Sequence, residues 1–153
     1  MGIGPGGPLD RTRRAEEAIA QSNVIVGYKH YLENINDLTA GKELISSGMT
    51  QETDRCHAAL ERARDGAIVA FVSSGDAGVY GMAGLTIEMA AARGIRVPIE
   101  IVSGVSAANA AAARFGAPLM LDYACISLSN LLVPWETIRR RVDRIYLLRR
   151  YCA

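Results

Sequence analysis

The chain has 153 residues, half of them hydrophobic, and its 17 Lys and Arg residues nearly balance 16 Asp and Glu residues. This length suits one domain with a substantial core. The net charge of +1 excludes the strong positive field with which basic proteins attract nucleic acid or an anionic membrane. The cysteines (Cys56, Cys125, Cys152) are odd in number and widely spaced, unlike the disulfide framework of a small secreted domain. Since His30 and His57 are also scattered, we expect no metal site.

The two ends of the chain indicate neither a membrane nor a nucleic-acid partner. The first segment, MGIGPGGPLDR, lacks the charged and apolar regions of a signal peptide, and no apolar run reaches the roughly 20 residues that span a bilayer. We therefore expect a cytoplasmic protein. The basic run near the other end, without paired aromatic residues, is typical of a solvated helix face; it comprises Arg139, Arg140, Arg141, Arg144, Arg149 and Arg150.

The predicted helices and strands alternate along the chain. In order, they are a helix at 12–22, strands at 24–27 and 42–45, a helix at 50–66, a strand at 67–73, a helix at 82–94 and a strand at 98–102. Thr50 is the expected N-cap of the second helix, and Gly66 and Gly94 lie where helices usually stop. The alternation predicts an α/β fold, with a mostly parallel sheet covered by helices on both faces.

Beyond Gly116 the pattern would open a second α/β unit. Residues 123–128 (YACISL) predict another strand, and Pro134 predicts the start of another helix. Only 37 residues follow Gly116, so a complete second domain cannot fit. We expect an N-terminal α/β domain at 1–118 that carries the ligand loops, and the beginning of a truncated second α/β domain at 119–153.

Three glycine-containing loops fall at the carboxyl ends of the predicted strands, where parallel sheets bind ligands. They are GIGPGG at 2–7, SSGDAGVYG at 73–81 and SGVSAA at 103–108. The first matches the dinucleotide pattern G-x-G-x-x-G, but that pattern needs a preceding strand and an acidic residue about 20 positions later. Both are missing, and Pro5 removes a donor N–H from the loop. A tight turn and a loop for another ligand remain open.

The second loop, extended to SSGDAGVYGMAG, is also open to two interpretations. Its glycines would let a ligand approach the backbone. Alternatively, Asp76 caps the N-terminus of a following helix, as Ser106 could cap the alanine-rich helix after the third loop. Tyr28, Tyr31 and Tyr80 could line the pocket of a flat ligand or belong to the core. None of these features identifies a function by itself.

Taken together, the segments resemble the tetrapyrrole methylases, and among them the precorrin-3B C17-methyltransferases of cobalamin biosynthesis. The resemblance runs from residue 2 to about 142 in one register. The segments that carry it are GIGPG (2–6), VIVGYKHYL (24–32), GMTQETDRCHAALERARDG (48–66), SSGDAGVYGMAG (73–84), GVSAANAAAARFGAPL (104–119) and ISLSNLLVPWETI (126–138). GVYGMAG and the ISLSNLLVPW wording are similar to this branch in particular.

The resemblance implies an S-adenosylmethionine-dependent enzyme with two α/β domains, the cofactor in the cleft between them, and usually a homodimer. Members of the branch methylate C17 of a precorrin and contract the macrocycle. The implied cofactor-binding residues are Pro5 from the first loop, Ser74, Gly75, Asp76 and Val79 from the second, and Ser106 and Ala107 from the third. Lys29 and Arg55 are candidates for binding the substrate's carboxylates. No catalytic acid or base is identified.

The chain departs from the family pattern in ways that predict an incomplete protein. The family has apolar residues before the first glycine loop, which form a central strand, and commonly has Pro where this chain has Ala77 and Ser103. After about Val142 the segment DRIYLLRRYCA is unlike the family's second domain. We expect a fragment with half of the cofactor cleft, insufficient for micromolar binding. The alternatives are another tetrapyrrole methylase, such as uroporphyrinogen-III methyltransferase, and a non-catalytic cofactor-binding module.

Overall fold

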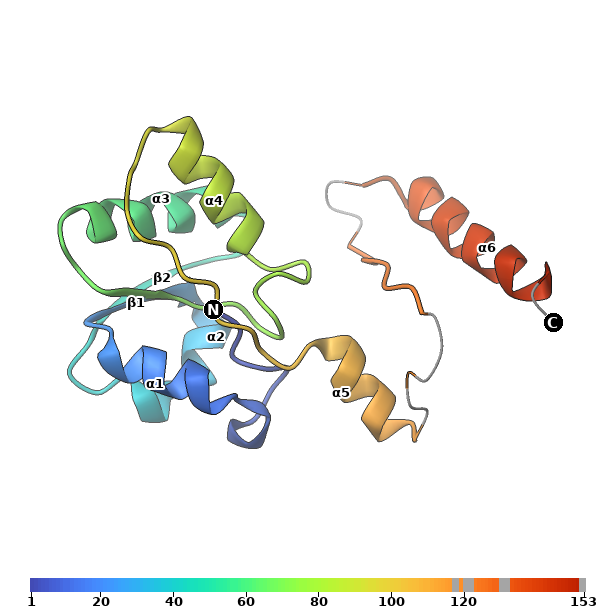
Figure 1. Cartoon of the computed structure of the whole chain (residues 1–153), viewed down its shortest axis with the longest axis horizontal. Coiled ribbons are helices and arrows are strands. Elements are labelled where there is room, and N and C mark those ends of the chain that lie inside the picture. Colours follow the sequence, from blue (N-terminus) through green and yellow to red (C-terminus); the bar gives the residue numbers. More distant parts are fainter. Residues whose placement is uncertain (117–118, 120–122, 130–132, 152–153) are drawn as a thin grey trace. The chain divides into compact units, whose positions relative to one another are not determined.

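The computed structural model describes residues 1–116, 119, 123–129 and 133–151. The chain divides into two compact units, Met1–Ala111 and Ala112–Ala153. The domain boundary predicted after residue 118 falls beside residues outside the described part and stays a prediction. The first unit contains a parallel sheet with the strand order β2-β1-β3, which confirms the predicted fold class (Figure 1). Its strands are β1 (Val24–Tyr28), β2 (Glu43–Ser47) and β3 (Val69–Phe71).

Helices cover both faces of this sheet, α1 and α2 on one face and α3 and α4 on the other (Figure 1). The first unit holds the 3₁₀ turns η1 (Pro8–Asp10) and η2 (Asn36–Leu38) and the helices α1 (Arg13–Gln21), α2 (Lys29–Glu33), α3 (Glu52–Arg64) and α4 (Ala83–Ala92). The side chain of Thr12 caps α1 by accepting the N–H of Ala15 at 3.2 Å.

The strands alternate their side chains between two cores, as a pleated sheet requires. On one face, Ile25 and Ala70 pack with Ile19 of α1 and Leu32 of α2. On the other face lie β1 and β3 residues that contact α3; they are Val24, Val26, Val69 and Phe71, with Ala59 of α3 among them. Burial on both faces explains why VIVG reads as a continuous apolar run.

Two of the three predicted helix boundaries are confirmed. Gly66 and Gly94 follow α3 and α4 with φ of 92° and 65°, the left-handed conformation that glycine adopts at helix ends. Thr50 was expected to cap α3, and this is wrong. It has a φ of 65°, and Gln51 occupies the N-cap position without a side-chain hydrogen bond. Instead, the Gln51 side chain accepts the N–H of Gly48 at 2.9 Å, which closes the turn before the helix.

The predicted strand at 98–102 does not form. Within the described residues, the main-chain bond that anchors this segment runs from the Gly2 N–H to the Val102 carbonyl oxygen at 2.9 Å. A strand needs consecutive pairs with a neighbour, and one bond is too few. The first residues pair on their other side with the end of β3, through single bridges Gly2↔Ser73 and Gly4↔Gly75. This short N-terminal segment therefore lies between the end of β3 and Val102 and is hydrogen-bonded on both sides.

The second unit contains α6 (Trp135–Tyr151), and α5 (Ala107–Arg114) crosses the division between the units. The Pro134 carbonyl oxygen accepts the N–H of Thr137 at 2.9 Å, so the predicted helix start is confirmed. The strand predicted at 123–128 is wrong, since these residues are described and form no ladder. A strand is stable only beside a partner strand, and no described residue pairs with this segment. No helix in the described ranges is both long and apolar enough to cross a membrane.

Candidate cofactor site

Three glycines bring the three predicted loops into direct backbone contact. Gly2, Gly75 and Gly104 come from the first, second and third loop, respectively. A Cβ atom on Gly104 would contact the Gly75 carbonyl oxygen and lie 2.8 Å from the Gly2 carbonyl carbon. A Cβ atom on Gly2 would contact that same oxygen and lie 2.8 Å from the Gly104 nitrogen. Any side chain at either position would push the loops apart.

Hydrogen bonds between main-chain groups fix the first two loops to each other. The Gly4 N–H donates to the Gly75 carbonyl oxygen at 3.1 Å, and the Gly75 N–H donates to the Gly4 carbonyl oxygen at 2.8 Å. Gly4 and Gly75 both have positive φ, 79° and 61°, which other residues rarely adopt. Pro5 follows Gly4 directly, at the point where the first loop meets the second.

Asp76 joins the second loop to the third. Its carboxylate accepts the N–H of Gly78 at 2.7 Å and the N–H of Gly104 at 2.9 Å. Desolvation raises the pKa of this carboxyl, but backbone N–H groups of Gly104, Gly78 and Val79 outweigh it and hold the pKa below its usual value. The alternative interpretation, in which Asp76 caps a helix, is wrong, because α4 begins only at Ala83 and Met82 is its N-cap. Its carboxylate instead holds two loops in register.

The structure gathers the seven predicted cofactor residues around this junction. Ser74, Gly75, Asp76 and Val79 share the second loop; Pro5 follows the Gly4–Gly75 bonds. A Cβ on Gly75 would point toward the third loop, 3.6 Å from the Ala107 nitrogen and 4.0 Å from the Ser106 Cα. Ser106 is also the predicted helix cap, since its hydroxyl accepts the N–H of Asn109 at 3.2 Å at the start of α5. Contact of these residues with a cofactor stays a prediction.

Sequence reasoning did not single out Gly2 and Gly104 as site residues. Both are glycines at the start of loops that the sheet rule had selected, which is a signal that could have found them. Their importance comes from a contact between loops about 100 positions apart, and no local pattern reveals such a contact.

A second feature, which we call the tyrosine pocket, borders the second loop. It is a cavity of about 160 Å³ lined by Tyr28, Tyr31, Glu52, Arg55, Val72, Ser73, Ser74, Tyr80, Gly81 and Met82. The rings of Tyr28 and Tyr31 meet edge to face with centroids 5.2 Å apart. Tyr80 has a φ of 55°, a strained conformation for a bulky residue, of a kind that clusters at functional sites. All three tyrosines proposed to line a flat ligand's pocket therefore share one cavity.

The two basic residues expected to bind substrate carboxylates differ in their exposure and in their internal bonds. The side chain of Arg55 is only 6% exposed, and its guanidinium donates to the Ser47 hydroxyl at 2.8 Å and the Gly48 carbonyl oxygen at 2.6 Å. It also pairs with Glu52 at 3.3 Å. These internal bonds give Arg55 a structural role between β2 and α3. Lys29 is exposed at the start of α2, directly after Tyr28 of the tyrosine pocket.

Three known proteins with similar sequences are named as methyltransferases. The chain is 45% identical over 142 residues to a probable cobalt-factor III C(17)-methyltransferase of Salmonella typhimurium, covering 93% of this chain and 59% of that protein. It is 46% identical over 147 residues to a cobalt-factor III methyltransferase of Priestia megaterium, covering 94% of this chain and 27% of that protein. A precorrin-3B C(17)-methyltransferase of Sinorhizobium sp is 41% identical over 145 residues, covering 93% of this chain and 57% of that protein.

The similar solved structures are also those of methyltransferases. The methyltransferase CobJ has a TM-score of 0.83 and 39% identity, covering 92% of this chain and 59% of that chain. A uroporphyrin-III C-methyltransferase of Thermus thermophilus, complexed with S-adenosylhomocysteine, has a TM-score of 0.62 and 26% identity. The match covers 84% of this chain and 54% of that chain. The chain thus spans no more than about three fifths of these relatives. The family model of tetrapyrrole (corrin/porphyrin) methylases matches residues 1–149, and the chain belongs to this family.

Proposed function

We propose that the chain supplies the cofactor-binding part of an S-adenosylmethionine-dependent methyltransferase of cobalamin biosynthesis. Its reaction would be methylation at C17 of a precorrin-type macrocycle, with ring contraction. The observation that carries the proposal is the junction at Gly2, Gly75 and Gly104, where three loops meet without intervening side chains. The names of relatives at 41–46% identity support the choice of substrate.

The proposed cofactor site works through backbone groups and shape. When bound, S-adenosylmethionine supplies a sulfonium methyl group that is already activated for transfer. The protein must then bind the cofactor, orient it and exclude water. Loop residues Pro5, Ser74, Gly75 and Val79, with Ser106 and Ala107 across from them, would form its cradle. Asp76 would act mainly by holding the loops, because its carboxylate already accepts two backbone N–H groups.

The tyrosine pocket is the proposed place where the macrocycle approaches the cofactor loops. Its tyrosine rings offer flat apolar surface to a flat ligand, and Ser73 and Ser74 belong both to its lining and to the second loop. Exposed Lys29, which follows Tyr28 of this pocket in the chain, is the better candidate for a substrate carboxylate, because Arg55 is engaged in internal bonds. A homodimer in the cytoplasm is part of the same proposal.

A substrate panel tests the activity. The purified chain is incubated with S-adenosylmethionine carrying a labelled methyl group, together with cobalt-factor III, precorrin-3B or uroporphyrinogen III. Label on either of the first two and not on the third supports the proposal. Label on uroporphyrinogen III alone would favour the other methylase branch. Cofactor binding without label on any macrocycle would favour the non-catalytic module and contradict the proposed activity.

A further inference from the structure

Tyr80 has a main-chain conformation that glycine would adopt at a lower cost. Its φ of 55° lies in the left-handed region, which disfavours a bulky side chain. Three glycines lie close to it in the chain, Gly78, Gly81 and Gly84, and none of them has a φ in this region. The strain therefore falls on the tyrosine in a loop that is rich in glycine. Such strain persists only where the surrounding structure imposes it, and it clusters at ligand sites.

The chain around Tyr80 is closed into a compact turn. The Asp76 carbonyl oxygen accepts the N–H of Val79 at 3.3 Å, and the Ala77 carbonyl oxygen accepts the N–H of Ala83 at 3.0 Å. Ala77 is buried, with an exposed fraction of 1%. The turn is therefore packed onto the protein at its base, and the tyrosine lies at its tip.

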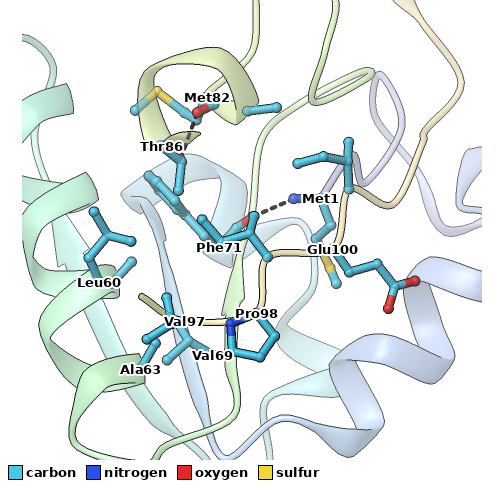
Figure 2. A pocket seen from close by; sticks show the side chains of 14 residues that line it. Met1, Leu60, Ala63, Val69, Phe71, Met82, Thr86, Val97, Pro98 and Glu100 are labelled. Carbon is cyan, nitrogen blue, oxygen red and sulfur yellow. Dashed lines mark hydrogen bonds between the residues drawn. The ribbon is translucent and has the colours of Figure 1, made fainter. Parts of the chain in front are cut away.

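The end of this turn is fixed by a close approach and by hydrogen bonds. A Cβ atom on Gly81 would lie 2.5 Å from the Ala77 carbonyl oxygen, so the chain passes too close for any side chain. The Met82 N–H donates to the Ser73 hydroxyl at 3.3 Å. The Met82 carbonyl oxygen accepts the Thr86 hydroxyl at 2.7 Å at the start of α4 (Figure 2). The direction in which the strained tyrosine projects is therefore set by the backbone on both sides of it.

Tyr80 is the most exposed of the three tyrosines that line the tyrosine pocket. It is 67% exposed, whereas Tyr28 and Tyr31 are half-buried. The ring of Tyr28 already has the edge of Tyr31 and, 5.9 Å from its centroid, the guanidinium of Arg55. The pocket volume of about 160 Å³ is below the roughly 300–1,000 Å³ of sites that enclose a drug-sized ligand. A macrocycle therefore cannot enter whole, and its outer part would lie against the exposed tyrosine.

We propose that Tyr80 is a specificity-determining residue whose ring stacks on one face of a flat, conjugated macrocycle at the mouth of the tyrosine pocket. The inference rests on the function proposed for that pocket. Ser74, Gly75 and Asp76 of the same loop belong to the proposed cofactor site. A ring that projects from this loop would therefore set where the macrocycle lies relative to the methyl group.

Stacking on Tyr80 selects for the shape of a macrocycle rather than for its charge. Aromatic rings attract each other when they lie offset and parallel, which requires a flat partner. A macrocycle with saturated bridging carbons is puckered and offers no continuous face, even when it carries the same carboxylate side chains. The proposal therefore predicts that the chain distinguishes two macrocycles that differ only in conjugation.

Calorimetric titration with uroporphyrin III and uroporphyrinogen III under argon tests this prediction. The two probes carry the same side chains, and only the first is conjugated and flat. We expect the unmodified chain to bind uroporphyrin III about fivefold more tightly. Tyr80→Leu, which keeps an apolar side chain without an aromatic ring, should weaken uroporphyrin III binding about fivefold and leave uroporphyrinogen III binding unchanged. Tyr80→Phe should keep both affinities.

Thr50 supplies a matched control for the strain. Its φ is 65°, and it is not among the residues that line the pocket. Glycine at either position removes the strain, so we expect neither Thr50→Gly nor Tyr80→Gly to lower the urea concentration at the midpoint of unfolding. Only Tyr80→Gly should weaken uroporphyrin III binding. A lower midpoint for Tyr80→Gly alone would show that the tyrosine is held for folding, which would overturn the proposal.

The titrations separate failure of this proposal from failure of the proposed function. If the unmodified chain binds uroporphyrin III and Tyr80→Leu binds it equally well, the role of Tyr80 is refuted and the proposed function stands. Equal binding of the two macrocycles by the unmodified chain would also refute the role of Tyr80 alone. If the unmodified chain binds neither macrocycle, the function proposed for the pocket fails, and the role of Tyr80 fails with it.

Discussion

The contact between Gly104 and Gly2 makes Gly104→Ala the sharpest test of the cofactor junction. The new methyl group would contact the Gly75 carbonyl oxygen and lie 2.8 Å from the Gly2 carbonyl carbon. These are main-chain atoms, which cannot rotate away as the tip of a long side chain does. The loops must therefore separate, which strains the 2.9 Å bonds from Gly104 to Asp76 and from Gly2 to Val102.

Overpacking of this kind costs typically 1–3 kcal/mol, so we expect the free energy of unfolding to fall by about 2 kcal/mol. In a unit of about 110 residues this corresponds to a decrease in Tm of roughly 10 °C. The matched control is Gly6→Ala in the same first loop. Gly6 is exposed and nothing lies within 4 Å of its Cβ position.

Urea denaturation followed by circular dichroism measures the free energy of unfolding of both variants. Gly6→Ala should stay within about 0.5 kcal/mol of the parent chain, while Gly104→Ala loses stability and any measurable affinity for S-adenosylhomocysteine. Equal stability and equal affinity in the two variants would refute the close convergence of the three loops.

Three further predictions concern Asp76, the Met1 amino group and Arg55. Asp76→Ala removes the acceptor of the Gly78 and Gly104 N–H groups and should cost about 2–3 kcal/mol, with Asp76→Asn intermediate because it keeps one acceptor oxygen; equal stability of the three chains in urea would contradict this. Burial lowers the pKa of the Met1 amino group from 8.0 to about 6, against the opposing effect of Asp76, so the folded state binds fewer protons than the unfolded state. Stability should therefore rise by about 2 kcal/mol between pH 6 and pH 8, and the rise should vanish in N-terminally acetylated protein; the same slope in both would refute it. Arg55→Ala should lower stability by about 2–3 kcal/mol through its lost bonds to Ser47 and Gly48, with Arg55→Lys less affected and cofactor affinity unchanged in both; lost affinity at unchanged stability would show a binding role instead.

The sequence predicted the architecture of the first unit because that architecture depends on local patterns. The apolar run at 24–27, the glycines at 66 and 94 and the proline at 134 all act on their immediate neighbours, and each has the predicted effect. The sheet rule then placed three loops at one edge, where the structure brings them together.

The errors concern properties that depend on distant partners. Residues 98–102 and 123–128 have the composition of strands, but a strand forms only where another strand offers paired N–H and C=O groups. The alternative of a helix cap at Asp76 also fails, because its carboxylate accepts the N–H of Gly104 from another loop. The role of Arg55 in binding a carboxylate stays a prediction, and its bonds to Ser47 and Gly48 could not be read from the local sequence either. In each case the partner is invisible in the local sequence.

The central claim is that the three loops together hold the cofactor, and backbone amide shifts test it most directly. The ¹⁵N-labelled chain is titrated with S-adenosylmethionine up to about 10 mM, a range that detects binding far weaker than micromolar. The account predicts shifts at the amides of Gly75, Asp76, Ser106 and Ala107, kept in Gly6→Ala and lost in Gly104→Ala. Unchanged amides in all three loops, or shifts confined to one loop or to another surface, would contradict it.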